Sequence, residues 1–290
     1  MIPRKGQRYR QIAAWAFTLP ALLFQFFFGW FPVLFAFGIA FQRYFFVKPP
    51  ETVGWQNFRD VAADPLTYTT FGNTFYYAFL ALALTFFIPI FVSILLMEMK
   101  RHTIRWMMVL WFIPVASTAG IAIWKYLYHP RLGLLNGMLM ALHLPPQQWL
   151  NNPRLVMFCL VAPSLILFGP GLIYIAALQS VPEELYEAAE LEGAGFFTKI
   201  RTVTLPRLRP LIAMMLIFSV IGSMQVFELP YIMTGGGPGY TTTTVVIHIF
   251  NLAFASYNLG KATALAIVLF FVIMTLVMLQ RRFYREDLDE

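Results

Sequence analysis

Charged residues are scarce in this chain. They make up 12% of its 290 residues, against roughly 25% in an ordinary soluble domain. Apolar residues make up 59%, and a water-soluble protein of this size could not cover its surface with so few charges. The composition therefore excludes an ordinary soluble domain and predicts that most of the chain lies in lipid.

Cysteine is almost absent, and so are the residue groupings of metal and catalytic sites. The single Cys159 excludes an internal disulfide and leaves the redox compartment open. No His pair has the H-x-x-x-H spacing of a metal site, and no apolar stretch holds paired carboxylates for acid–base chemistry. We therefore expect no metal, no bound cofactor and no catalytic residue. The four histidines stand apart: His102, His129, His143 and His248.

The Gly-rich run at 235–239 lacks what a phosphate-binding loop needs. The P-loop pattern G-x-x-x-x-G-K-[ST] places a lysine on the phosphates, whereas no Lys follows Gly239 before Lys261. Since glycine tolerates positive φ, the run predicts a turn. Any ATP hydrolysis would then occur on another chain.

Long apolar runs are what the sequence does contain. A membrane span needs about 20 mainly apolar residues, and helices are expected because lipid offers no partner to an open strand edge. The predicted fold class is an all-α polytopic membrane bundle of six transmembrane helices. They lie within Ile12–Phe41, Phe71–Met97, Trp106–Trp124, Leu155–Leu178, Leu211–Phe227 and slightly beyond, and Ala262–Gln280.

The distribution of Lys and Arg predicts the orientation. Six spans place both termini on one side, and 14 of the 21 Lys and Arg fall on that side, in the two tails and the links 98–105 and 179–209. The positive-inside rule makes this side cytoplasmic. It also explains the net charge of +7 without nucleic acid. A cleaved signal peptide is the alternative, but the uncharged run Gln11–Gln42 far exceeds an h-region of about 7–15 residues.

The segment Val245–Tyr257 is open to two interpretations. It is uncharged and could be a seventh span, but it is short, and Thr, His and Asn residues lie in and around it. We favour an external helix at the membrane surface. Its apolar stripe would comprise Val246, Ile249, Phe250, Ala253 and Phe254.

The longest polar stretch between spans is Gln179–Arg209, on the predicted cytoplasmic side. Ser180 and Glu183 have the spacing of a capping box, and Gly193 and Gly195 are suited to ending a helix. The pattern predicts a short acidic helix with a narrow apolar strip of Leu185, Ala188 and Ala189. Such a helix fits a groove on a soluble partner, although a plain connecting helix is equally compatible with these residues.

A signature in this stretch resembles the EAA loop of ABC importer permeases with the MetI-like fold. Glu187-Ala188-Ala189 precedes Gly193 by three residues, and Val203-Thr204-Leu205-Pro206 follows after nine more. The family pattern has Ile where Val203 stands. The resemblance implies a coupling loop (residues 180–206) whose helix enters a cleft of an ATPase subunit, with Glu187 facing a basic group and Gly193 allowing the exit turn. It implies that Glu187, Ala188, Ala189, Gly193, Leu205 and Pro206 couple the chain to that ATPase.

The resemblance also implies partners. They are a second permease subunit forming a heterodimer, two copies of a cytoplasmic ATPase that hold ATP and magnesium, an external solute-binding protein and the lipid bilayer of a prokaryotic inner membrane. The permease itself would be a non-catalytic subunit.

Three further patches resemble the carbohydrate-uptake branch, the maltose- and glycerol-phosphate-type permeases. They are Asn73-Thr74, the segment from Trp124 through His129-Pro130 to Gly133–Asn136, and Thr234–Pro238. The last resembles the first of the two permeases in such systems. The implied solute is an oligosaccharide, a polyol or a glycerol phosphate derivative. The implied domains are 1–70 (basic tail, first span and external loop), 71–284 (permease core) and 285–290 (cytoplasmic tail).

Polar groups at membrane depth are the candidates for a solute path, because they should face the bundle interior. Small hydroxyl residues, however, often bond only within a helix pair. The candidates are Asn73, Trp111, Ser117, Gln225, Glu228 and Tyr231.

Two rival functions remain to be weighed. An ion-coupled secondary transporter would need acids buried within spans and often has two repeated halves, and the sequence contains neither. A membrane-embedded transferase or hydrolase would need a carboxylate or His cluster at a membrane face. The acidic run Glu183–Glu192 is the single cluster, and its helical pattern suits docking better.

Overall fold

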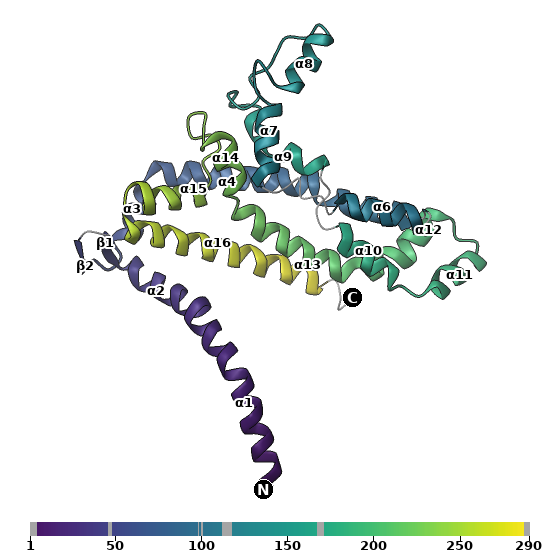
Figure 1. Ribbon diagram of the computed structural model, residues 1–290, viewed down its shortest axis with the longest axis horizontal. Helices are drawn as coiled ribbons and strands as arrows, with labels where there is room; N and C mark the ends of the chain where they lie inside the picture. Colours follow the sequence, from purple (N-terminus) through teal and green to yellow (C-terminus); the bar gives the residue numbers. More distant parts are fainter. Residues whose placement is uncertain are drawn as a thin grey trace. The chain divides into compact units, whose positions relative to one another are not determined.

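The computed structural model describes residues 5–45, 48–97, 99, 101–111, 118–166 and 171–286, and these are mainly helical, as predicted (Figure 1). The α-helices are α1 (Lys5–Gln25), α2 (Phe31–Ala40), α3 (Gln56–Ala63), α4 (Pro65–Thr85), α5 (Phe87–Met97), α6 (Arg101–Trp111), α7 (Thr118–Leu127), α8 (Leu134–Ala141), α9 (Val156–Ile166), α10 (Gly171–Gln179), α11 (Glu183–Leu191), α12 (Phe196–Lys199), α13 (Leu205–Met224), α14 (Glu228–Thr234), α15 (Val245–Phe250) and α16 (Leu259–Glu286). Three π-helical turns and two strands complete the set: η1 (Phe26–Trp30), η2 (Ile200–Thr204), η3 (Asn251–Ala255), β1 (Gln42–Phe45) and β2 (Lys48–Thr52).

The chain divides into two compact units. The first comprises residues 1–64 and 249–269, and the second comprises 65–248 and 270–290.

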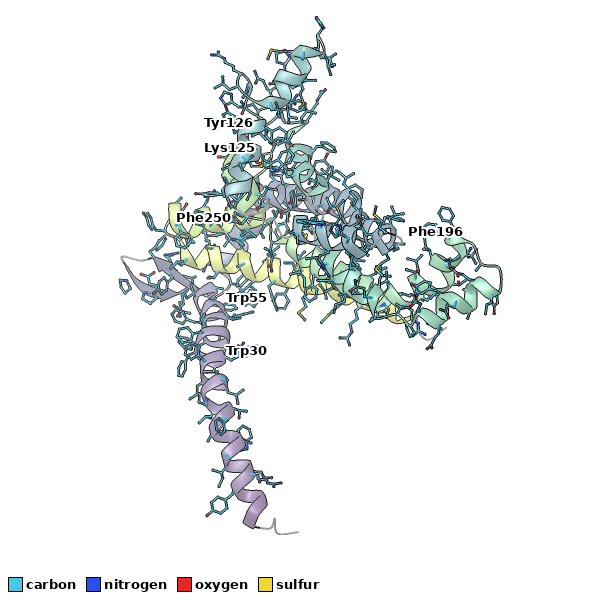
Figure 2. The ribbon with its side chains drawn as sticks, turned by 45° about the vertical axis from the view of Figure 1, so that its right-hand side comes forward. Trp30, Trp55, Lys125, Tyr126, Phe196 and Phe250 are labelled. Carbon is cyan, nitrogen blue, oxygen red and sulfur yellow. The ribbon has the colours of Figure 1, made fainter. Side chains whose placement is uncertain are left out.

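In the first unit, the N-terminal helical run is apolar on every side. Tyr9–Ala40 forms a helix of 32 residues in which 6% of the most apolar window is buried within the chain. Its side chains, Trp30 among them, project outward from the helix (Figure 2). A helix that is hydrophobic all round is stable only in an apolar environment, so lipid or another subunit must cover this run.

A small antiparallel hairpin follows this run and adds a two-stranded sheet to the predicted all-α bundle. Gln42 pairs with Thr52, and Arg43 pairs with Glu51. Pro49 is a strand residue in β2, and proline disfavours a helical conformation in the residue before it. The hairpin therefore turns the chain between α2 and α3.

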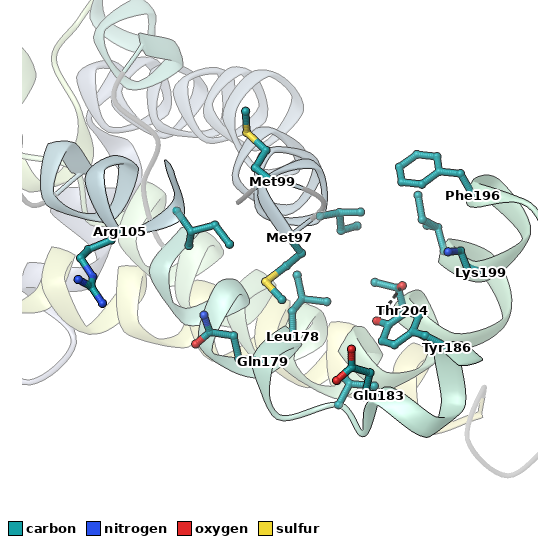
Figure 3. A pocket seen from close by; sticks show the side chains of 14 residues that line it. Met97, Met99, Arg105, Leu178, Gln179, Glu183, Tyr186, Phe196, Lys199 and Thr204 are labelled. Atoms are coloured by element: carbon teal, nitrogen blue, oxygen red, sulfur yellow. Dashed lines mark hydrogen bonds between the residues drawn. The ribbon is translucent and has the colours of Figure 1, made fainter. Parts of the chain in front are cut away.

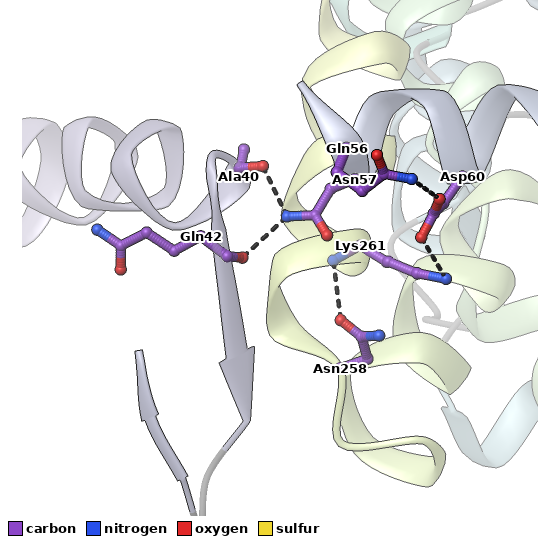
Figure 4. A network of polar contacts seen from close by, with 7 residues as sticks. All are labelled: Ala40, Gln42, Gln56, Asn57, Asp60, Asn258 and Lys261. Carbon is purple, nitrogen blue, oxygen red and sulfur yellow. Dashed lines mark hydrogen bonds and ion pairs between the residues drawn. The ribbon is translucent and has the colours of Figure 1, made fainter. Parts of the chain in front are cut away.

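A polar network fixes the hairpin to α3 (Figure 4). The Asn57 amide nitrogen donates to the carbonyl oxygens of Ala40 and Gln42, at 2.8 Å each. Asp60 accepts a hydrogen bond from Gln56 at 2.7 Å and pairs with Lys261 at 2.8 Å. The carbonyls at the end of α2 are thus satisfied by a buried side chain.

In the second unit, α4 packs against α13 and α9, and α5 packs against α10. One buried cluster contains Tyr77, Ile121, Tyr128, Met157, Leu160 and Met233. Another contains Phe86, Ile90, Ile94, Tyr174, Leu208 and Met215. These contacts hold the helices that carry the coupling loop and the external loops.

The break between α4 and α5 has a sequence cause. Proline has no N–H, and its ring clashes with the carbonyl four residues earlier, which for Pro89 is that of Thr85, the last residue of α4. Downstream, the Ser93 hydroxyl donates to the Gly171 carbonyl at 3.0 Å. This bond ties α5 to the start of α10.

Four helices among the described residues are long and apolar enough to cross a membrane. They are Tyr9–Ala40, Pro65–Met97, Phe196–Thr234 and Leu259–Arg282, which correspond to the first, second, fifth and sixth predicted spans. The third and fourth predicted spans include 112–117 and 167–170, which lie outside the described residues. The count of six therefore stays a prediction.

The segment Val245–Ala255 is a shorter apolar helix and not one of these four. Val245 and Ile247, which lie outside the predicted stripe, are buried, whereas Phe254 in the stripe is 57% exposed, so the membrane-surface position of the stripe stays a prediction. His248 is also buried. This helix packs into the protein, and the hydrophobic pattern alone did not identify which face does so.

Candidate functional site

Helix α11 is the predicted acidic helix, and its end is formed as expected. Gly193 adopts φ +82°. There the Gly193 N–H donates to the Glu190 carbonyl and the Ala194 N–H to the Ala189 carbonyl, both at 2.9 Å. The left-handed residue turns the chain while satisfying the last carbonyls.

The predicted capping box at the start of α11 is wrong. The N-cap residue is Pro182, without a side-chain cap bond. The Ser180 hydroxyl instead donates to the Ala177 carbonyl at 2.7 Å, at the end of α10. The helix begins too late for Ser180 to be its N-cap residue.

The signature splits between two faces of α11. Glu187 and Ala188 are exposed, while Leu185, Tyr186 and Ala189 are partly buried. The predicted strip of Leu185, Ala188 and Ala189 lies at the border of the two faces, because Leu185 and Ala189 are half-buried whereas Ala188 is exposed. The structure brings Glu187 and Ala188 together on a surface that a partner can reach.

Two polar contacts connect the inner face of α11 to the helical run that follows, and Figure 3 shows the one between Tyr186 and Thr204. The hydroxyls of Tyr186 and Thr204 are 3.2 Å apart, and Thr204 is 4% exposed. Lys199 Nζ lies 2.6 Å from Glu190 Oε1. These contacts connect α11 to α12 and η2, so the helix cannot turn about its own axis without breaking them.

Leu205 and Pro206 begin α13 directly after η2. Pro206 occupies the first turn of α13, where a missing N–H costs nothing. The apolar helical run Phe196–Thr234 is 39 residues long, about twice what a span requires. Movement of α11 can therefore reach the membrane through one helical run.

A cavity of about 790 Å³ lies between the coupling loop and the ends of α5, α6 and α10. Its apolar wall includes Ile94, Met97 and Leu178, and Arg105 and Lys199 supply cationic groups (Figure 3). Because Glu183, Tyr186 and Thr204 also line it, the inner face of α11 borders this space.

Asn73 holds the loop around Tyr240 and Thr243 in place. Its amide nitrogen donates to the carbonyls of Tyr240 and Thr243, at 2.7 and 3.0 Å. The neighbouring Thr74 hydroxyl, fully buried, accepts a hydrogen bond from the Val245 N–H at 3.0 Å. Both donors of the Asn73 amide are thus engaged by the protein, which makes Asn73 a structural residue rather than a free hydrogen-bond donor to a solute.

The Gly-rich loop (residues 234–243) is a turn, as predicted. Gly235, Gly236 and Gly239 all have positive φ. The Thr243 hydroxyl donates to the Gly236 carbonyl at 2.9 Å, and a Cβ on Gly236 would lie 2.6 Å from that hydroxyl. Hydroxyl groups of threonine residues within the loop thus donate hydrogen bonds to its backbone carbonyls.

The other described solute-path candidates surround a break in the helical run. Residues 225–227 separate α13 from α14, and the Thr244 hydroxyl donates to the freed Val226 carbonyl at 2.8 Å. Gln225, Glu228 and Tyr231 are exposed there, and the rings of Phe227 and Tyr231 stack with centroids 4.9 Å apart. Ser117 and the side chain of Trp111 lie outside the described residues.

The patch from Trp124 to Asn136 also has a structural role. The buried Asn136 amide donates to the carbonyls of Pro130 and Gln147 and accepts hydrogen bonds from the Gln147 N–H and the Trp149 ring, all within 2.8–2.9 Å. At the neighbouring helix α7, Lys125 (labelled in Figure 2) donates to the Ile232 carbonyl at 2.8 Å. The external loops are thus anchored by long-range polar contacts.

Comparison with known proteins then decides the family. Residues 73–285 match the family described as "Binding-protein-dependent transport system inner membrane component". The chain belongs to this family. It is a helical permease of the inner membrane, with the MetI-like fold.

Several relatives resemble the permease over most of their length. The sulfoquinovosyl glycerol transport permease of Agrobacterium fabrum is 32% identical, with 82% of the permease and 78% of the relative covered. The trehalose/maltose transport permease of Thermococcus litoralis is also 32% identical, with 88% of each covered. An arabinooligosaccharide transport permease of Bacillus subtilis is 32% identical, with 91% and 86% covered.

A solved structure supports the fold. A chain of a bacterial ABC transporter involved in the import of alginate superposes with a TM-score of 0.83 at 23% identity, with 97% of the permease and 98% of that chain covered.

Some residues of the site could not be found from the sequence. The motif includes Thr204, but nothing in the pattern assigned Tyr186 as its partner, and no signal linked Thr244 to the break at Val226. Both pairs depend on the fold rather than on sequence spacing.

Proposed function

We propose that the permease is one half of the translocation pathway of an ATP-driven importer for a sugar or a sugar-like solute. Its partners would be a second permease subunit, two copies of a cytoplasmic ATPase that carry ATP and magnesium, and an external solute-binding protein. Both termini would be cytoplasmic. The family match favours this function over the ion-coupled alternative.

One observation carries the coupling assignment. Glu187 and Ala188 are exposed on a short helix whose opposite face is connected to the run leading into α13. A rigid exposed helix joined to a span can transmit the closure of an ATPase pair to that span. Gly193, Leu205 and Pro206 would serve the same coupling by forming the turn and the start of the span.

A carbohydrate solute is supported by the site near the helix break. Sugars are bound by hydrogen bonds together with aromatic faces, and the stacked rings of Phe227 and Tyr231 lie beside exposed Gln225 and Glu228. The names of the relatives refer to glycosylated glycerol, disaccharides and oligosaccharides. Discontinuous helices are a common place for solute sites in transporters.

Reconstitution tests the proposal. Liposomes containing both permeases and the ATPase should take up sugar only with ATP and the binding protein present. The variants Glu187→Lys and Gly193→Asp should abolish uptake while membrane insertion stays normal. Uptake by the chain alone without ATP would overturn the proposal. A thermal-shift screen of the binding protein against sugars and phosphodiesters would identify the solute class.

A further inference from the structure

Two apolar side chains of the coupling loop are far more exposed than their chemistry favours. Leu191, at the end of α11, is 90% exposed, and Phe197, in α12, is 82% exposed. Exposed apolar residues of a membrane protein normally face lipid. The stretch 179–209, however, carries five Glu and four Lys or Arg, so these two side chains lie in a polar region.

Leu191 shares the outer face of α11 with the family signature. Residues three and four apart are neighbours on a helix surface, and Leu191 follows Ala188 by three and Glu187 by four. All three are exposed. The outer face therefore presents the carboxylates of Glu184 and Glu187, one small residue that permits close approach and one large apolar side chain.

The chain cannot readily bury this face by rotating α11. The Tyr186–Thr204 and Glu190–Lys199 contacts fix the inner face to η2 and α12. In α12, Phe196 is partly buried and lines the cavity, whereas the adjacent Phe197 points away from it into solvent. Leu191 and Phe197 are thus held in the open on either side of the turn at 192–195.

The charged residues near Leu191 and Phe197 indicate what kind of surface would bind them. Glu190 is already neutralised by Lys199, whereas Glu184, Glu187 and Glu192 are exposed carboxylates near the apolar pair. A complementary surface would have an apolar floor and a cationic rim. This fits a soluble protein groove rather than lipid tails, because hydrocarbon would leave the charges without partners.

We infer that Leu191 and Phe197 are the two apolar anchors by which the coupling loop seats in the ATPase, on either side of the Gly193 turn. The inference rests on the proposed function and adds two residues outside the family signature. Interface energy is concentrated in a few buried apolar anchors. The loop would therefore be bound by these side chains and oriented by Glu187.

Cysteine accessibility tests the inference, since the natural Cys159 is 3% exposed and should give little background labelling. Leu191→Cys, Phe197→Cys and Glu187→Cys would be labelled with a water-soluble maleimide in the full transporter, with the ATPase bound and after its removal. We expect at least tenfold slower labelling of Leu191→Cys and Phe197→Cys when the ATPase is bound. Leu132→Cys, at a position 69% exposed in an external loop, is the control and should be unaffected.

The outcomes separate the inference from the proposed function. Protection of Glu187→Cys without protection of the other two would overturn the inference and leave the coupling assignment intact. Absence of protection at all three positions would overturn both. As a second measurement, Leu191→Gln and Phe197→Gln should each weaken ATPase binding about tenfold, the loss expected for one large apolar anchor. Wild-type affinity for both variants would also count against the inference.

Discussion

The amide nitrogen of Asn73 donates to the carbonyl of Tyr240 across 2.7 Å, although the two residues are 167 positions apart. The same nitrogen donates to Thr243. This contact joins two segments that resemble the carbohydrate-uptake permeases, Asn73-Thr74 and the Gly-rich loop. A resemblance spread over distant patches thus corresponds here to a single structural unit.

Asn73→Ala should lower the thermal stability of the purified permease. The part-buried carbonyl of Thr243 and the exposed carbonyl of Tyr240 would lose their donor, and an unsatisfied buried acceptor costs about 1–3 kcal/mol. Scanning calorimetry or a fluorescence melt in detergent would show a lower Tm. Gln225→Ala is the matched comparison, because Gln225 is exposed at the helix break. It should reduce uptake at unchanged Tm. An unchanged Tm with a raised KM for Asn73→Ala would instead favour direct solute contact.

Gly193→Ala should impair coupling, whereas Gly195→Ala should be tolerated. No atom lies within 4 Å of a Cβ at either position, but only Gly193 has positive φ, at +82°. A left-handed conformation costs an L-residue about 1–2 kcal/mol, so the turn after α11 should relax and displace Glu187. Solute uptake per ATP hydrolysed is the measurement. Equal coupling ratios for the two variants would argue against a role for the turn geometry.

Gly260→Ala should destabilise the permease. A Cβ at Gly260 would overlap the Gln42 carbonyl oxygen and lie 2.8 Å from the Asn57 amide nitrogen. Overpacking of this kind costs about 1–3 kcal/mol. Gly222→Ala is the control, because a Cβ there meets nothing within 4 Å. The melting temperature should fall for the first variant and hold for the second, and a similar Tm for both would contradict this close approach.

The stability contribution of Asp60 should depend on pH. The hydrogen bonds from Lys261 and Gln56 lower the pKa of the Asp60 carboxyl below its ordinary value. A lowered folded-state pKa means that the contribution is present above the unfolded-state pKa and is lost as pH falls through the folded-state pKa. Asp60→Asn should therefore lower the Tm at neutral pH, and the difference from wild type should shrink on acidification.

The exposure of the Asp60–Lys261 pair limits the expected change in Tm, and a second ion pair provides the control. Asp60 and Lys261 are 31% and 35% exposed, so solvent screening keeps the effect small. Glu51→Gln serves as the control, because the Arg43–Glu51 pair is 3.6 Å apart and its side chains are more than half exposed. The Tm of this variant should stay close to that of the wild type, because exposed ion pairs contribute little to stability. A difference for Asp60→Asn that grows toward low pH would have the wrong sign for this mechanism.

The sequence by itself determined the features that depend on local pattern. Hydrophobic runs identified four spans that the described residues contain, because burial in lipid requires only length and apolarity. The helix Glu183–Leu191 and its end at Gly193 followed from propensity and from the freedom of glycine to take positive φ. The signature around Glu187 identified the family because its spacing is fixed along the chain.

Only the tertiary structure decided which partner each polar side chain contacts and which side chains of α11 face outward. Asn73 was predicted to lie on the solute path, and the structure adds that its amide holds the Gly-rich loop, since its partners are set by the packing of α4 beside that loop. Ala188 and Ala189 are adjacent in the signature, yet one faces outward and the other inward because Tyr186 is anchored to Thr204. These outcomes depend on contacts between residues far apart in the sequence, and no local pattern encodes which of the possible partners will meet.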